Sequence, residues 1–193
     1  LGLQENEEED FQQMLPHIFF TSPLRRKREC MIVSNVQGQS GLWKYGISGD
    51  LPIIVLSIAS TNEADIVRQM LKAHEYWRMK GLAVDLVVIH EEEGSYMQPL
   101  QDMIREIVSV SHVRELQDKP GGVFIRSGKT MPEEDRNLLF TVARIVIYGH
   151  AGNISSQIEM QHHDGRKENA TVLWPGQPKR YHNGLQPAEG LLY

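Results

Sequence analysis

Four short apolar runs, separated by helical segments, constrain the fold of this chain most strongly. The first run, residues 51–59, reads LPIIVLSIA and has apolar side chains at almost every position. A strand with one face in solvent would alternate, so an unbroken run indicates a strand buried on both faces of a parallel sheet. Similar runs follow at residues 83–90, 123–126 and 144–148. We therefore predict a sheet that is covered on both sides.

Helical segments fill the connections between these runs. Three predicted helices each follow a capping-box pair, in which a Ser or Thr precedes a Glu or Gln by three residues. The helices are residues 62–80, 95–110 and 132–143, with the pairs Ser60–Glu63, Ser95–Gln98 and Thr130–Glu133. A weak strand at residues 112–116 and a short helix at 152–160 complete the pattern. Repeated strand–helix units indicate an α/β fold, with a parallel, helix-flanked sheet of the Rossmann or flavodoxin kind.

The regular pattern stops at both ends of the chain. Residues 1–20 predict an acidic helix, and a connector with a Ser-Pro turn and the basic run RRKR follows it. From residue 161 the sequence is polar and rich in Pro and Gly, with one strand-like stretch at 170–174. We therefore divide the chain into a helical arm and connector (1–50), an α/β core (51–160) and a linker-like tail toward a next domain (161–193).

Composition argues against several classes of function. The formal net charge of -5 counts against a nucleic-acid partner, because binding phosphates requires an excess of Lys and Arg. No stretch approaches the ~18 apolar residues of a membrane span, so we expect no direct membrane contact. Cys30 is the one cysteine, which fits a reducing, cytoplasmic compartment. His162, His163 and Asp164 have no further ligands at matching spacing, so we expect no metal, and no motif indicates a cofactor.

The loop GISGD, residues 46–50, has the composition of a phosphate-binding turn in the wrong place. Phosphate loops follow a strand and open a helix, whereas this loop precedes the first predicted strand. We interpret it as a structural entry turn. In this interpretation Gly46 and Gly49 permit a tight turn, while Ser48 and Asp50 bond its exposed backbone.

Polar side chains follow the predicted strands at their carboxyl ends, where parallel α/β sheets bind ligands. The residues expected there are Ser60, Thr61, His90, Glu91, Glu92, Glu93, Arg126, Lys129, Tyr148 and His150. We take as candidate ligand-binding residues Ser60, Thr61, His90, Arg126, Lys129 and His150. The alternative is that these are ordinary polar loops. RSGKT at 126–130 is not a Walker loop, because Val123 stands where its first glycine would be.

The remaining conspicuous side chains have two interpretations each. Trp43 and Trp174 could stack on sugars, as exposed indoles do, or could fix the arms to the core. His74 lies on the apolar stripe of a predicted helix, which favours a packed histidine over a catalytic base. No nucleophile elbow, Ser-His-Asp order or carboxylate pair is evident, so no catalytic residue is predicted.

Several segments together resemble one family. They read GQSGLWKYGISGDLPIIVL, LKAHEYWRMKGLAVDLVVIHEE, SYMQPLQDMI and DKPGGVFIRSGKTMPEEDRNLLFTVARIVI. These segments resemble the central region of cyclic β-1,2-glucan synthases and 1,2-β-oligoglucan phosphorylases, in glycoside phosphorylase family 94. The opening LGLQENEEEDFQQMLPHIFF and the closing NGLQPAEGLLY extend the resemblance to nearly the whole chain.

The resemblance implies a longer parent enzyme, with a β-sandwich domain before this region and an (α/α)6 barrel after it. In that family the barrel holds the general-acid aspartate and most of the phosphate and sugar contacts, so no catalytic residue transfers to this chain. A parent that is a synthase would be anchored in the inner membrane through segments outside this one. Whether the parent synthesises a cyclic glucan or phosphorolyses a linear one stays open.

Three functions follow from the residues and the resemblance. The first is a noncatalytic structural or accessory domain of a carbohydrate-active enzyme that acts on β-1,2-glucan, with the two neighbouring domains as partners. The alternative is a module that binds a small ligand or the glucan at the carboxyl-end edge of the sheet. A freestanding small α/β enzyme is the third.

Overall fold

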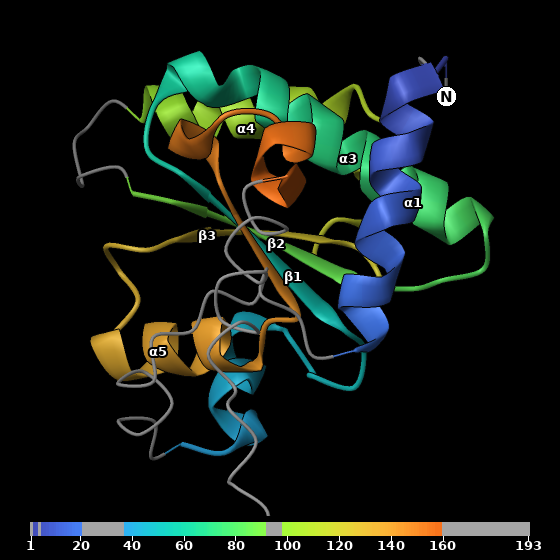
Figure 1. The fold of residues 1–193 in the computed structure, drawn as a ribbon. Helices are drawn as coiled ribbons and strands as arrows, with labels where there is room; N and C mark the ends of the chain where they lie inside the picture. The colour runs from blue at the N-terminus through green and yellow to red at the C-terminus, as the bar shows by residue number, and fades with distance from the viewer. Residues whose placement is uncertain (1, 4, 21–36, 92–97, 160–193) are drawn as a thin grey trace, which may run out of the picture.

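Four parallel strands form the centre of the molecule. The computed structural model describes residues 2–3, 5–20, 37–91 and 98–159. In this part of the chain the strands are β1 (Ile53–Ile58), β2 (Asp85–His90), β3 (Val123–Ser127) and β4 (Ile145–Tyr148). Each strand overlaps one predicted apolar run. They form one sheet in the order β3-β2-β1-β4, which is the order at the start of a Rossmann fold. The predicted α/β class is confirmed (Figure 1).

The strands contribute to a separate core on each face of the sheet. In β1, Ile54, Leu56 and Ile58 face one core, whereas Ile53 and Val55 face the other. Every residue of β1 and β2 is buried, which explains why their sequences do not alternate.

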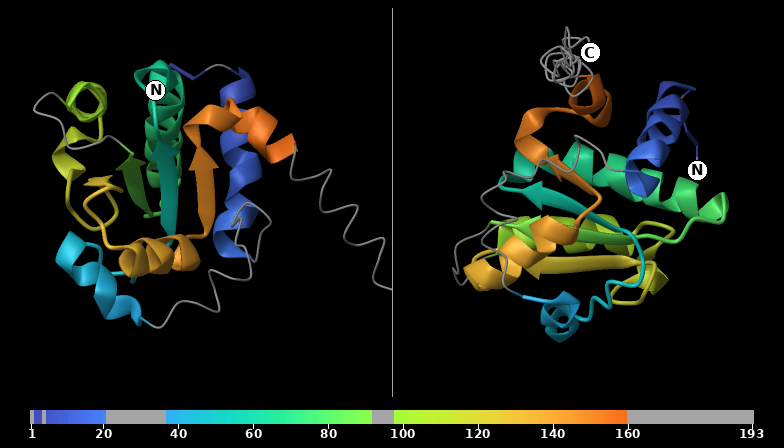
Figure 2. Two further views of the ribbon diagram at one scale, coloured as in Figure 1. Left: turned by 90° about the vertical axis from the view of Figure 1, so that its left-hand side faces the viewer. Right: turned by 60° about the horizontal axis from the view of Figure 1, so that its bottom comes forward.

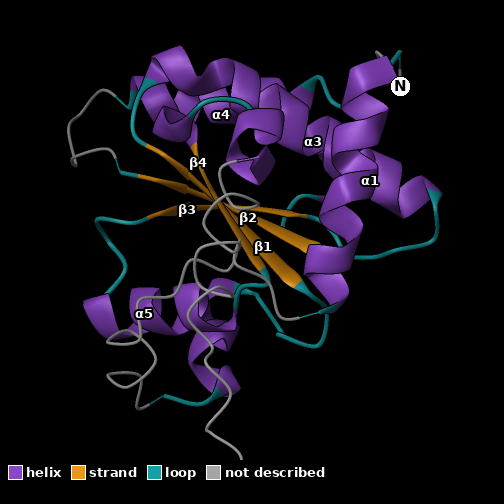
Figure 3. Cartoon of the chain, in the orientation of Figure 1, coloured by secondary structure: helices purple, strands orange, loops and turns teal. Residues whose placement is uncertain are grey.

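The first face of the sheet is covered by helices α1 (Glu5–Phe19), α3 (Ala64–Met79) and α4 (Pro99–Ser109), and by helical residues 154–159. Figure 3 shows these helices on one side of the strands. The predicted N-terminal helix packs against α3, where Nε1 of Trp77 donates a 2.9 Å hydrogen bond to the carbonyl of Phe11. Lys72 and Glu7 add an ion pair of 2.9 Å between the same helices.

The second face is covered by α5 (Glu133–Val142) and the 3-10 helix η2 (Gln39–Tyr45). The buried side chain of Leu42 places η2 in this core. This 3-10 helix lies in the segment predicted as a connector, where no helix was expected. A seven-residue helix with one buried side chain has too short a periodic pattern to be recognised.

The predicted helix starts differ from the observed ones in their capping. The 3-10 helix η3 (Thr61–Glu63) precedes α3. Ser60 Oγ accepts from the N–H of Asn62 at 3.3 Å. The carboxylate of Glu63 accepts the N–H of Ala59, whereas in a capping box it would accept the N–H of Ser60. Thr130 Oγ1 donates to the carbonyl of Ser127, so it does not cap α5. Ser95 and its capping pair lie outside the described residues.

The predicted strand at residues 112–116 is wrong. This segment contains the 3-10 helix η4 (Arg114–Leu116). Val113 and Leu116 both contact the first core, and a spacing of three residues puts both on one side of a 3-10 turn. The predicted strand at 170–174 and the tail at 161–193 lie outside the described residues.

Candidate functional site

The carboxyl ends of β1 and β4 meet where the strand order changes direction, which is where open α/β sheets bind ligands. Here the position is filled by a side chain of the protein itself. Oε2 of Glu63 accepts the N–H of Ala59 at 2.9 Å. A Cβ added at Gly149, in the 3-10 turn η5 (Gly149–Ala151), would lie 2.1 Å from that oxygen. The Glu63 carboxylate therefore occupies the space between the two strand ends.

Gln157 closes the end of β4 in a similar way. Its side chain is fully buried, and its amide donates to the carbonyls of Tyr148 at 2.9 Å and Gly152 at 3.0 Å. Its carbonyl accepts the N–H of Tyr148 at 3.2 Å. Figure 2 shows the helix of residues 154–159 beside the tip of this strand.

The candidate residues of β1 and β4 lie around this filled position. Ser60 is half-buried and caps η3, while Thr61 is exposed. His150 is exposed, and its ring centroid lies 5.5 Å from that of Tyr148.

The candidate residues His90 and Lys129 lie on β2 and in the turn after β3. His90 is buried, with 2% of its surface exposed, and its carbonyl accepts the N–H of Gly128 at 2.9 Å. Lys129 is exposed in the following turn. Glu91 forms an ion pair of 2.6 Å with Arg136 of α5, so its charge is balanced within the protein.

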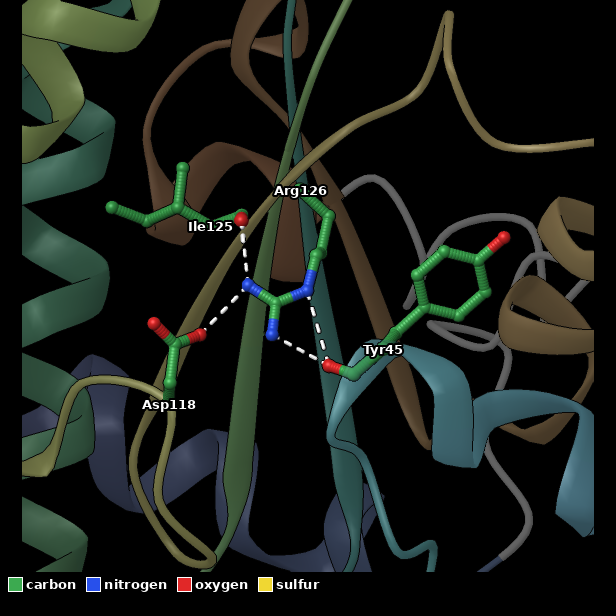
Figure 4. A network of polar contacts seen from close by, with 4 residues as sticks. All are labelled: Tyr45, Asp118, Ile125 and Arg126. Carbon is green, nitrogen blue, oxygen red and sulfur yellow. Dashed lines mark hydrogen bonds and ion pairs between the residues drawn. The ribbon is translucent and has the colours of Figure 1, made fainter.

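Arg126 joins β3 to η2 and does not extend from the carboxyl-end edge. Nε and Nη2 donate to the carbonyl of Tyr45 at 3.1 and 2.5 Å, and Nη1 donates to Asp118 at 2.7 Å (Figure 4). Nη1 also reaches the carbonyl of Ile125 at 2.8 Å. Asp118 precedes β3 and its N–H binds the carbonyl of Val123, so the guanidinium extends back along the strand. The cation also sits at the carbonyl end of η2, where positive charge is favourable.

The GISGD turn lies at the opposite, amino end of β1. Gly46 and Gly49 have φ values of 75° and 77°, a region that side chains disfavour. The N–H of Asp50 donates to Oγ of Ser48 at 3.2 Å. This is the geometry of a tight turn that leads from η2 into the sheet.

Two side chains of η2 bind this turn and border two hollows. Gln39 and Trp43 both donate to the carbonyl of Ser48, at 2.7 and 3.2 Å. Trp43 is nevertheless 64% exposed. The larger hollow, about 330 Å³, is lined by Gln39, Leu42, Gly49, Asp50, Leu51, Pro52, Ile53, Val142 and Arg144. The other, about 310 Å³, is lined by Trp43, Gly46, Ile47, Ser48 and Asp50. Trp43 is conspicuous in the sequence, but no local pattern indicates the hollow beside it.

Two titratable groups where η2 meets α5 have shifted pKa values. Burial alone would raise the pKa of Asp135, but hydrogen bonds from Lys44 and Tyr45, both 2.6 Å, outweigh it and lower that pKa. Burial, and then the Asp135 carboxylate, raise the pKa of Tyr45 to about 12.

The amino end of the sheet holds two further buried groups. Burial lowers the pKa of His74, whose Nε2 is 3.0 Å from the carbonyl of Val84. Burial raises the pKa of Asp85, whose Oδ1 accepts the N–H of Gly121 at 2.7 Å. Among the described residues, no group of three or more His, Cys, Asp or Glu side chains is placed to hold a metal ion. None of the described helices is long and apolar enough to cross a membrane.

The chain is similar in sequence to a known protein. No protein-family model matches the sequence. The chain is 31% identical over 159 residues to the cyclic β-(1,2)-glucan synthase NdvB of Rhizobium meliloti (strain 1021). The match covers 82% of this chain but 6% of that protein, so the chain corresponds to a small part of its relative's length. The resemblance seen in the sequence motifs is confirmed: the chain is related, over most of its length, to a segment of a cyclic β-(1,2)-glucan synthase.

Proposed function

We propose that this chain is a noncatalytic accessory domain of a carbohydrate-active enzyme that acts on β-1,2-glucan. The observation that supports this most directly is Glu63, whose carboxylate fills the space between the ends of β1 and β4. A ligand in the usual position of an α/β sheet would have to displace that group from the N–H of Ala59. The relative that the chain resembles is a glucan synthase by name, which supplies the substrate class.

The proposed role is to support and orient neighbouring domains of a longer chain. A β-sandwich before this segment and an (α/α)6 barrel after it are the partners we propose, and the chemistry would take place in the barrel. Two packed cores, with helices on both faces of a parallel sheet, suit such a role, because they give a rigid body. We also propose a cytoplasmic location, in line with the single cysteine.

A direct test is to assay the purified chain for phosphorolysis. The chain is incubated with linear β-1,2-glucan and phosphate, and glucose 1-phosphate is measured against a family 94 phosphorylase as positive control. A cooperative urea unfolding transition of the same sample demonstrates that it is folded. We expect no glucose 1-phosphate above background. Turnover that increases with the concentration of the purified chain would refute the noncatalytic role.

A further inference from the structure

We propose that a β-linked glucosyl residue binds at the amino-end edge of the sheet, on a surface formed by Gln39, Trp43, Asp50 and Arg144. We call this the Trp43 surface. The inference rests on the proposed function, because the glucan is the ligand chosen. It differs from the carboxyl-end site expected from the sequence, since it lies at the other end of β1.

The exposed indole of Trp43 provides the first argument. A side chain of this size that is 64% exposed keeps a large apolar area in contact with water. Its Nε1 donates to the carbonyl of Ser48, which fixes the ring relative to the turn. The negative face of an indole attracts the C–H bonds of a pyranose ring, and a fixed ring loses little entropy when a sugar stacks on it.

The two hollows that Asp50 lines provide the second argument. Their volumes, about 330 and 310 Å³, are at the small end of the range of ligand sites, about 300–1,000 Å³. Asp50 lines both, so its carboxylate can accept hydroxyl protons from a sugar in either. Gln39 and the exposed Arg144 also line the larger hollow. The amide nitrogen of Gln39 already donates to Ser48 and Asp50, at 2.7 and 3.4 Å. Arg144 therefore supplies the donors for sugar oxygens, and the side-chain carbonyl of Gln39 is a further acceptor.

The chemistry of this surface favours a sugar over a neighbouring domain. The centre of a protein–protein interface is depleted in charged residues. Here two charged side chains, Asp50 and Arg144, line the same hollow, together with the amide of Gln39. A combination of an aromatic face with hydrogen-bonding groups of both kinds matches the alternating apolar faces and hydroxyl edges of a pyranose.

The test is an NMR titration of the whole chain with a linear β-1,2-glucan oligosaccharide, followed through backbone amides and the indole N–H signals. We expect saturable shifts with a millimolar dissociation constant, concentrated at Gln39, Trp43, Ser48 and Asp50. Cello-oligosaccharide, whose glucosyl residues are also β-linked, should produce comparable shifts, because the argument rests on the glucosyl ring and not on the 1,2-linkage. No shifts at millimolar glucan would overturn the inference, as would shifts centred on Ser60 and His150.

Variants separate stacking from loss of the fold. Trp43→Ala should weaken binding about tenfold, whereas Trp43→Phe keeps a ring but loses the Nε1 hydrogen bond to Ser48, and should have an intermediate affinity. Asp50→Asn should weaken it as well. Phe19→Ala is the control, because Phe19 is also an exposed aromatic residue (59%) but lies on α1. Unchanged affinity in Trp43→Ala would refute the proposal.

The two proposals fail in different experiments. Absence of glucan binding would remove the Trp43 surface and leave the accessory role intact. Phosphorolysis by the chain would refute the noncatalytic role whatever the titration shows. A protein partner in place of a sugar would show itself if an adjoining domain, added separately, shifted the Trp43 signals while the glucan did not, and this too would overturn the inference.

Discussion

The phenol of Tyr45 donates a 2.6 Å hydrogen bond to Oδ2 of Asp135, and the ammonium group of Lys44 lies 2.6 Å from the same oxygen. Asp135 is completely buried in the first turn of α5, where the helix dipole favours a negative charge. Lys44 and Tyr45 are the last two residues of η2. One carboxylate therefore joins the segment that enters the sheet to the helix that crosses its second face.

Replacing Asp135 by Ala should destabilise the protein. The change removes two charge-assisted hydrogen bonds and leaves the Tyr45 hydroxyl without its acceptor, so we expect a loss of about 2 kcal/mol in the free energy of unfolding. The Lys44 side chain is 56% exposed, so the expected loss in the free energy of unfolding is smaller than for a fully buried ion pair. Urea unfolding provides the measurement. Asp65→Ala, which breaks an exposed ion pair with Arg68, is the control and should change stability by less than about 0.5 kcal/mol. Equal effects in both variants would contradict this account.

Tyr45 should make the protein less stable at alkaline pH. Its pKa is raised from 10.0 to about 12, mainly by burial, so the folded state favours the neutral phenol. The corresponding stabilisation is complete below pH 10, where the unfolded phenol is also neutral, and is lost as pH rises toward 12. In Tyr45→Phe the free energy of unfolding should fall less steeply as pH rises from 10 toward 12. Unfolding free energies of both proteins across this range test it, and identical slopes would refute it.

The strands were predictable because burial on both faces leaves an unbroken apolar pattern, as in Ile53–Ile58. The strand order could not be read in this way, since the pattern of one strand carries no information about its neighbours. Short segments such as Arg114–Leu116 were also beyond prediction, because two apolar residues three apart fit either a bent strand or a 3-10 turn.

The candidate site was predictable only as a location. Topology alone brings the loops after parallel strands to one edge, so the residues named there follow from the strand assignment. The direction of each side chain depends on long-range partners. Arg126 turns back to Tyr45, 81 positions earlier in the sequence, and Glu63 closes the gap beside Gly149. Neither contact has a local sequence signal.

His74 should make the protein less stable at acidic pH. Burial lowers its pKa below 6.5, and its Nε2 must carry the proton that binds the carbonyl of Val84, since a carbonyl can only accept. The folded state thus favours the neutral ring, so the stabilisation is complete above pH 6.5 and is lost as pH falls through the lowered pKa. His74→Gln retains a donor and should have a flatter dependence of unfolding free energy on pH below 6.5. An unchanged slope would show that another group titrates.

The space between the carboxyl ends of β1 and β4, which the Glu63 carboxylate occupies, can be probed by adding a methyl group at Gly149. In Gly149→Ala the new Cβ would lie 2.1 Å from Oε2 of Glu63, so the carboxylate must leave the N–H of Ala59. We expect a loss of about 2 kcal/mol from crowding and the broken hydrogen bond. Glu63→Ala alone should cost about 1 kcal/mol, because it removes the same hydrogen bond without the clash.

The double variant decides whether this contact is the cause. If the carboxylate is what the methyl group strikes, Gly149→Ala should cost little in the Glu63→Ala background, and the two single losses should exceed the double loss by about 1 kcal/mol or more. Gly38→Ala is the matched control, since nothing lies within 4 Å of its added Cβ, and it should be nearly neutral. Additive losses measured by urea unfolding would mean that Glu63 does not fill this position in solution, and the main support for a noncatalytic role would be removed.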